Sequence, residues 1–76
     1  GIANVTANNI SVYPNPFTGY IIVDATESGT VQIFDISGKI VLTSRLTIGK
    51  NHIATSELQK GVYLLKVGGD AVKVVK

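Results

Sequence analysis

Short runs of β-branched residues, interrupted every few positions by turn-forming residues, constrain this chain more than any other feature. Val, Ile and Thr together account for 26 of the 76 residues, whereas Ala, Leu, Glu and Gln together account for only 14. The first group favours strands and the second favours helices. Eight Gly, two Pro and frequent Asn and Ser separate the runs at the spacing of a small antiparallel sandwich. The sequence therefore predicts an all-β fold.

Seven strands are expected, after a less regular first segment. Residues 1–9 are small and polar without sustained alternation, so they are interpreted as a linker or a loose first strand, and residues 10–76 as the domain. The expected strands are residues 10–13, 20–24, 30–36, 39–46, 52–54, 62–67 and 71–76. Residues 55–61 are expected to form one helical turn or a loop, with Leu58 as its anchor to the core. Strands 30–36 and 62–67 are apolar at both odd and even positions, so only packing decides which of their faces points inward.

Composition excludes several classes of protein. The hydrophobic share of 45% is too high for a disordered chain. There is no Cys, so neither a disulfide framework nor a cysteine-rich zinc site can support a domain that buries only roughly 60% of its unfolded surface. The net charge of +2 is too small to indicate a nucleic-acid partner. The apolar runs are far shorter than the about 20 residues of a membrane-spanning helix, and no secretory signal peptide is expected in the chain as given.

A corner with two prolines separates the first two expected strands. Pro14 and Pro16 lack backbone N–H donors and hold Asn15 outside the helical region, which predicts a rigid, extended connection. A structural role, with Phe17 closing one end of the core, is favoured over a role as a recognition loop, although the two roles are compatible. The corner comprises Tyr13, Pro14, Asn15, Pro16 and Phe17.

A glycine marks the next turn. Gly38 lies between two apolar β-runs, at the position where a hairpin with a glycine bulge needs a left-handed residue. Asp35, at the start of this turn, is interpreted as a turn cap rather than a calcium ligand, because the alternating oxygen ligands and terminal Glu of an EF-hand are missing.

Further segments accompany the corner in a fixed order. Phe34-Asp35-Ile36-Ser37-Gly38-Lys39 lies in the middle of the chain, Leu58 and Gly61-Val62-Tyr63 follow, and Lys73-Val74-Val75-Lys76 ends it. Each pattern is common alone, but together they resemble the type IX secretion (Por secretion) C-terminal sorting domain, type A. That family combines a "YPNP" segment, a "V.IFD..G" hairpin, a "G.N.I....L..G.Y" stretch and a lysine-containing final strand. The resemblance covers residues 10–76.

The resemblance implies an immunoglobulin-like sandwich that serves as a non-enzymatic address label at the C-terminal end of a larger exported protein. The implied route runs through the periplasm and outer membrane of a Gram-negative bacterium to the cell surface. The implied partners are an outer-membrane shuttle protein, the translocon, an N-terminal cargo domain, and a sortase-like protease that cuts near the N-terminal junction. No cofactor and no nucleic acid are expected, and a homodimer stays an open alternative.

The side chains that could take part in catalysis or metal binding are more simply interpreted as surface or packing residues. His52 is the single histidine, and a nucleophilic or zinc site would need partners for it, so a surface or cross-strand packing role is favoured. Asp24 and Glu27 are close in sequence, but paired carboxylates must converge across a pocket to act as acid and base. No catalytic, cofactor or metal site is predicted.

The final hairpin is the predicted partner-binding region. Residues 62–65 are apolar on both faces, which exceeds what one core requires, and the last strand is expected at a sheet edge, where it could pair with a partner's strand. The predicted partner-binding residues are Gly61, Tyr63, Leu65, Lys66, Lys73, Val74, Val75 and Lys76.

Four of the seven basic residues fall within the last 17 positions, namely Lys60, Lys66, Lys73 and Lys76. They fit an acidic partner or anionic lipopolysaccharide, whereas protection of a sheet edge is the simpler explanation from the residues alone. Charge reversal at Lys73 and Lys76 is expected to leave the fold nearly intact while weakening binding to the shuttle protein.

The alternative function is an adhesion or carbohydrate-binding spacer of the fibronectin or immunoglobulin type. Such a module would present exposed aromatic residues as a sugar platform. The chain has five aromatic residues and no Trp, and most of them stand where a core would use them.

Overall fold

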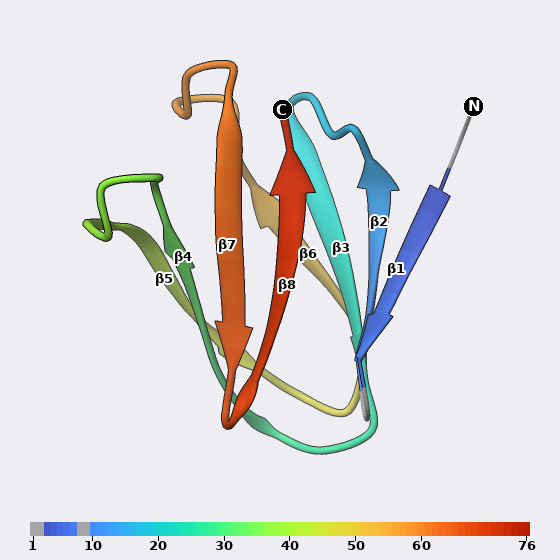
Figure 1. The fold of residues 1–76 in the computed structure, drawn as a ribbon. Coiled ribbons are helices and arrows are strands. Elements are labelled where there is room, and N and C mark those ends of the chain that lie inside the picture. The colour runs from blue at the N-terminus through green and yellow to red at the C-terminus, as the bar shows by residue number, and fades with distance from the viewer. Residues whose placement is uncertain (1–2, 8–9) are drawn as a thin grey trace.

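The computed structural model describes residues 3–7 and 10–76, which form eight strands (Figure 1). The strands are β1 (Ala3–Ala7), β2 (Ile10–Asn15), β3 (Tyr20–Ala25), β4 (Gly29–Phe34), β5 (Ile40–Leu46), β6 (Gly49–Ala54), β7 (Val62–Val67) and β8 (Asp70–Val75). The seven expected strands correspond to β2–β8, and β1 lies within the segment interpreted as a linker or loose first strand. What was expected of residues 1, 2, 8 and 9 lies outside the described residues.

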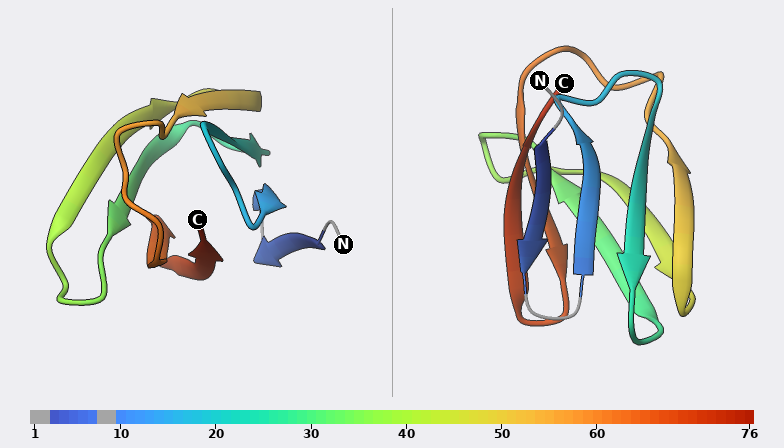
Figure 2. Two further views of the ribbon diagram at one scale, coloured as in Figure 1. Left: turned by 90° about the horizontal axis from the view of Figure 1, so that it is seen from above. Right: turned by 90° about the vertical axis from the view of Figure 1, so that its right-hand side faces the viewer.

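The strands form two antiparallel sheets of four (Figure 2). The first sheet has the order β1-β2-β3-β6 and the second has the order β5-β4-β7-β8. After the β4–β5 hairpin the chain returns to the first sheet as β6, then crosses to the second sheet for the β7–β8 hairpin. These crossings, with sheets facing each other across one core, produce a small immunoglobulin-like sandwich and confirm the predicted fold class.

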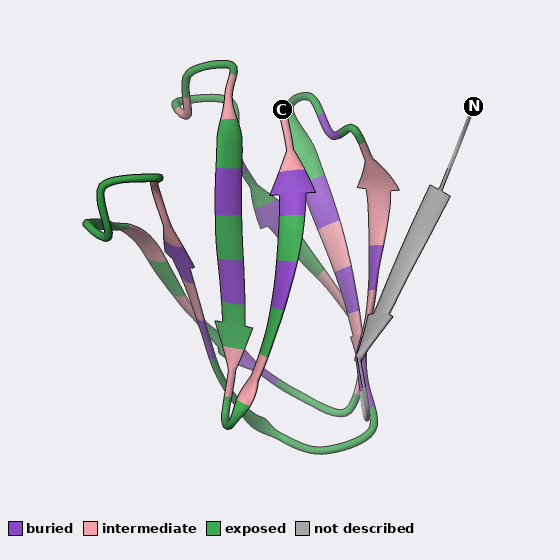
Figure 3. Ribbon diagram, viewed as in Figure 1, coloured by how far each residue is buried: buried purple, intermediate pink, exposed green. Residues whose placement is uncertain are grey.

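Alternation along the strands decides the composition of the core (Figure 3). In β7, Tyr63 and Leu65 are buried while Val62 and Leu64 are 40% exposed. The odd-numbered side chains of this strand, which is apolar on both faces, therefore point into the core. In β4, Val31 and Ile33 point inward by the same criterion. The core consists of Ile10, Val12, Phe17, Ile21, Val23, Ala25, Val31, Ile33, Leu46, Ile53, Tyr63, Leu65, Val72 and Val74.

The β4–β5 turn confirms the predicted hairpin with a glycine bulge. Gly38 has φ +91°, its N–H donates to the Asp35 carbonyl at 3.0 Å, and the Asp35 N–H donates to the Lys39 carbonyl at 2.9 Å. The Asp35 carboxylate accepts bonds from the Ser37 hydroxyl at 2.6 Å and from the Lys39 N–H at 3.0 Å. Asp35 therefore caps the turn, as expected.

The connection between β6 and β7 is a loop rather than a helical turn. Leu58 packs against the core from this loop, as its predicted role as an anchor requires, and its N–H donates to the Thr55 carbonyl at 3.0 Å. Nothing in the described part of the chain forms a helix long and apolar enough to cross a membrane.

Candidate functional site

Segments far apart in the sequence meet at one end of the sandwich. The corner between β2 and β3, the β4–β5 turn, the β6–β7 loop and the end of β8 all lie at the top of Figure 1. We call this end the C-terminal end. It contains the Tyr13–Phe17 corner, the Asp35–Lys39 turn, the Leu58–Tyr63 loop and the last residues of the chain, so the candidate functional site is built there.

The corner is bonded to the edge of β8. The Asn15 side chain accepts a hydrogen bond from the Val75 N–H at 3.0 Å and donates one to the Lys73 carbonyl at 3.4 Å. The Phe17 N–H donates to the Val75 carbonyl at 2.8 Å. These are the groups that an added strand would use, and β1 also runs beside β8 (Figure 2). The prediction that the last strand lies at a sheet edge is confirmed. The expectation that its backbone groups are unpaired is wrong at Lys73 and Val75.

Two aromatic residues close this end of the core. Phe17 is 1% exposed, and its ring packs against the Tyr63 ring with the centroids 6.1 Å apart. The Tyr63 hydroxyl donates to the Gln59 carbonyl at 2.6 Å, which is the tyrosine-corner arrangement of immunoglobulin-like sandwiches. The predicted structural role of Phe17 is confirmed.

The side chain of Lys76 is bonded to the β6–β7 loop. Its ammonium group donates to the Thr55 carbonyl at 2.7 Å and to the carbonyls of Ser56 and Leu58. Its backbone also exchanges bonds of 3.1 and 2.9 Å with Gly61. Lys76 is therefore a structural residue, and the expectation that its charge can be reversed with little effect on the fold is not supported.

The predicted partner-binding residues differ in how far they are buried. Tyr63, Leu65 and Val74 are buried in the core. Lys66 and Lys73 are exposed, while Gly61, Val75 and Lys76 are half-buried. Sequence reasoning missed Val62 and Leu64, which alternate with the buried positions of the same strand. The two-sided apolar pattern of that strand was the signal, but it did not identify which face was exposed.

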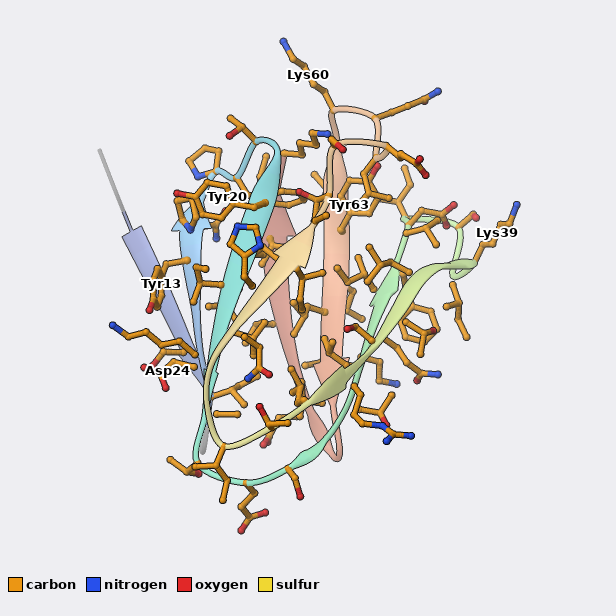
Figure 4. The ribbon with its side chains drawn as sticks, turned by 180° about the vertical axis from the view of Figure 1, so that it is seen from behind. Tyr13, Tyr20, Asp24, Lys39, Lys60 and Tyr63 are labelled. Atoms are coloured by element: carbon orange, nitrogen blue, oxygen red, sulfur yellow. The ribbon has the colours of Figure 1, made fainter. Side chains whose placement is uncertain are left out.

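The groups that could carry acid, base or metal chemistry do not form a site. His52 is exposed on β6 and stacks on the Tyr20 ring with the centroids 4.9 Å apart, in the predicted packing role. Figure 4 shows Asp24 far from Lys60, which belongs to the β6–β7 loop. The hydrogen bond from Ser37 lowers the pKa of Asp35, which stabilises a turn. The described residues contain no group of three His, Cys, Asp or Glu suited to a metal ion.

Comparison with protein families matches residues 11–76 to the family described as the secretion system C-terminal sorting domain. The chain belongs to this family. The match covers β2 from its second residue, all of β3–β8, and every segment of the C-terminal end described above. No significant match is found among curated proteins or among solved structures. The resemblance to the type IX secretion C-terminal sorting domain is thus confirmed, and with it the general role of a C-terminal signal for secretion and sorting.

Proposed function

We propose that this sorting domain is a non-enzymatic signal that directs a covalently attached cargo through the type IX system to the surface of a Gram-negative bacterium. The family match over residues 11–76 carries the proposal. The packed C-terminal end supports it, because a transferable signal must keep one shape whatever cargo precedes it. An outer-membrane shuttle protein and the translocon read the domain, and neither nucleic acid nor a cofactor takes part.

We further propose that a sortase-like surface protease removes the domain on the N-terminal side of β2. Proteases bind extended backbone, and β1 is an extended strand that lies at the edge of its sheet. Removal there leaves β2–β8, and with them the family-matched region, intact.

A reporter fusion tests the export proposal. A signal-peptide-bearing fluorescent protein with this chain at its C-terminus should reach the cell surface in a bacterium with a type IX translocon, and should stay in the periplasm in a translocon mutant. Surface labelling of intact cells measures the difference. Periplasmic retention of a well-folded fusion in the parent strain contradicts the proposal.

Carbohydrate binding stays the alternative, and Tyr20 is the residue on which it would depend. Tyr20 is 41% exposed on the outer face of the first sheet, but its ring is stacked on His52 rather than standing as an open platform. Glycan binding that is lost on Tyr20→Ala would favour this alternative.

A further inference from the structure

The outer face of the second sheet is apolar where solvent-facing positions are usually polar. Cross-strand register places Ile40 beside Phe34 and Phe34 beside Leu64. Val62 and Val75 form the next pair toward the C-terminal end. Ile40 is 47% exposed, and Val62 and Leu64 are 40% exposed. The row therefore runs from β5 through β4 to β7, and it reaches β8 at Val75, the neighbour of Val62.

A hollow of about 560 Å³ lies within this row. Phe34, Val62 and Leu64 line it from the sheet, and Lys66 and Lys73 lie at its side. Ile36, which is 86% exposed in the β4–β5 turn, borders it at the C-terminal end. A concave apolar lining of this kind is suited to a side chain that protrudes from a partner.

Two lysines and one aspartate line the hollow, namely Lys66, Lys73 and Asp35. The Asp35 carboxylate accepts bonds from Ser37 and Lys39 of its own turn, so the lysines are the charged side chains that are left to face a partner. The charged residues at outward positions of β4, β5, β7 and β8 are Arg45, Lys66 and Lys73. Asp70 has the same alternation as the buried Val72 and Val74, so it belongs to the inward series. The Lys66 ammonium lies 5.5 Å from the centre of the Phe34 ring, and Lys73 is the cross-strand neighbour of Leu64. The lysines therefore border the apolar row.

These observations decide among three occupants. A second copy of the chain, docked face to face, would bring the Lys66 and Lys73 side chains of both copies together, which is unfavourable. A lipid surface accommodates protruding apolar side chains, whereas the residues of the row line a hollow. A folded protein that presents an apolar side chain surrounded by carboxylates complements both the shape and the charge.

We propose that this outer face, defined by Phe34, Ile40, Val62, Leu64, Lys66 and Lys73, docks an acidic protein surface with a protruding apolar side chain. The proposal rests on the proposed export function and assigns the acidic surface to the outer-membrane shuttle protein. It moves the predicted contact from the β8 edge, which the corner covers, to the open face of the same hairpin.

Binding to the purified shuttle protein in detergent tests the proposal, with the chain fused behind a monomeric fluorescent protein. Leu64→Ser should weaken binding about tenfold, because it removes an apolar anchor. Lys73→Glu should weaken it about fivefold, and raising the salt concentration should weaken parental binding, because charges at an interface rim are screened. Ile48→Ser and Lys50→Glu are the matched controls, since both positions are exposed and lie away from this face. Both controls should bind like the parent.

Several outcomes would overturn the assignment. Binding equal to the parent for both Leu64→Ser and Lys73→Glu, in variants with unchanged melting temperatures, excludes this face. Failure of the parental chain to bind the shuttle protein excludes the assigned partner. Binding to phosphatidylglycerol vesicles that Leu64→Ser abolishes, with shuttle binding intact, indicates a lipid surface. A dimer in sedimentation that Leu64→Ser dissociates indicates a second copy.

The export assay separates this inference from the proposed function. If the parental fusion stays in the periplasm, the export function fails. If the parent and both face variants reach the surface equally well, the function stands and the docking face is wrong.

Discussion

At the scale of single residues, Asn15 shows how a polar side chain can replace a strand. A β-strand at a sheet edge leaves its outward N–H and C=O groups without a partner strand. The Asn15 amide offers one acceptor and one donor to Val75 and Lys73 of β8, in the manner of a neighbouring strand. The prolines on either side hold the amide in place by restricting the backbone around it.

Asn15→Ala should lower the free energy of unfolding by about 1–3 kcal/mol, because it leaves the part-buried Val75 N–H without its acceptor. Urea denaturation measures the change, and the Val75 amide should also exchange faster with deuterium. Asn15→Asp is the control, since it keeps an acceptor oxygen and should retain most of the protection. If Asn15→Ala matches the parent in both measurements, the corner does not protect the edge.

At the scale of elements, the β4–β5 hairpin depends on one backbone conformation. Gly38 has φ +91°, where a side chain is strained even though a Cβ atom would meet no neighbour within 4 Å. The Asp35 carboxylate organises the rest of the turn through bonds to Ser37 and Lys39. The turn also positions Ile36 beside the hollow of the second sheet and Ile40 beside Phe34.

Gly38→Val should destabilise the domain by about 1–3 kcal/mol, because a β-branched residue is forced to a positive φ. Thermal melting monitored by circular dichroism measures the effect. Gly29→Val is the matched control: Gly29 begins β4 without a positive φ and also has open space at its Cβ position. Equal melting temperatures for Gly38→Val and the parent would show that the turn is not under this constraint.

At the scale of the whole molecule, one end of the sandwich is held by bonds between segments distant in sequence. Thr55, although polar, is buried, and its hydroxyl and N–H donate to the carbonyls of Thr18 and Gly19 at 2.9 Å each. Its carbonyl in turn accepts from Lys76. The end of β8 is thus linked through one loop to the first sheet, so a loss of the terminal residues acts on the whole fold.

Lys76→Met should lower the free energy of unfolding by about 1–3 kcal/mol, because it removes a charged donor from three loop carbonyls. Lys73→Met, at an exposed position of the same strand, should change it by no more than about 0.5 kcal/mol. Chemical denaturation of the two variants measures the difference. If Lys76→Met and Lys73→Met unfold with equal free energies, Lys76 has no structural role. It would then again be a candidate for partner recognition.

Local patterns in the sequence predicted strands β2–β8, the two characteristic turns and the family. β-Branched runs, paired prolines and a glycine between two strands act through backbone preferences that hold without tertiary context. The sequence also predicted that Phe17 closes one end of the core and that Leu58 anchors its loop to the core, and both residues contact it.

Only the tertiary structure decided which residues are available to a partner. A strand that is apolar at every position has two equivalent faces until it is packed, and packing placed Tyr63 inside and Leu64 outside. The covered edge of β8 and the role of Lys76 depend on contacts between residues far apart in the chain: 60 positions separate Asn15 from Val75, and 21 separate Thr55 from Lys76. The periodicity of a sequence reflects only residues that are close together along the chain. These contacts join residues that are far apart along the chain, and they form only when the two sheets pack together.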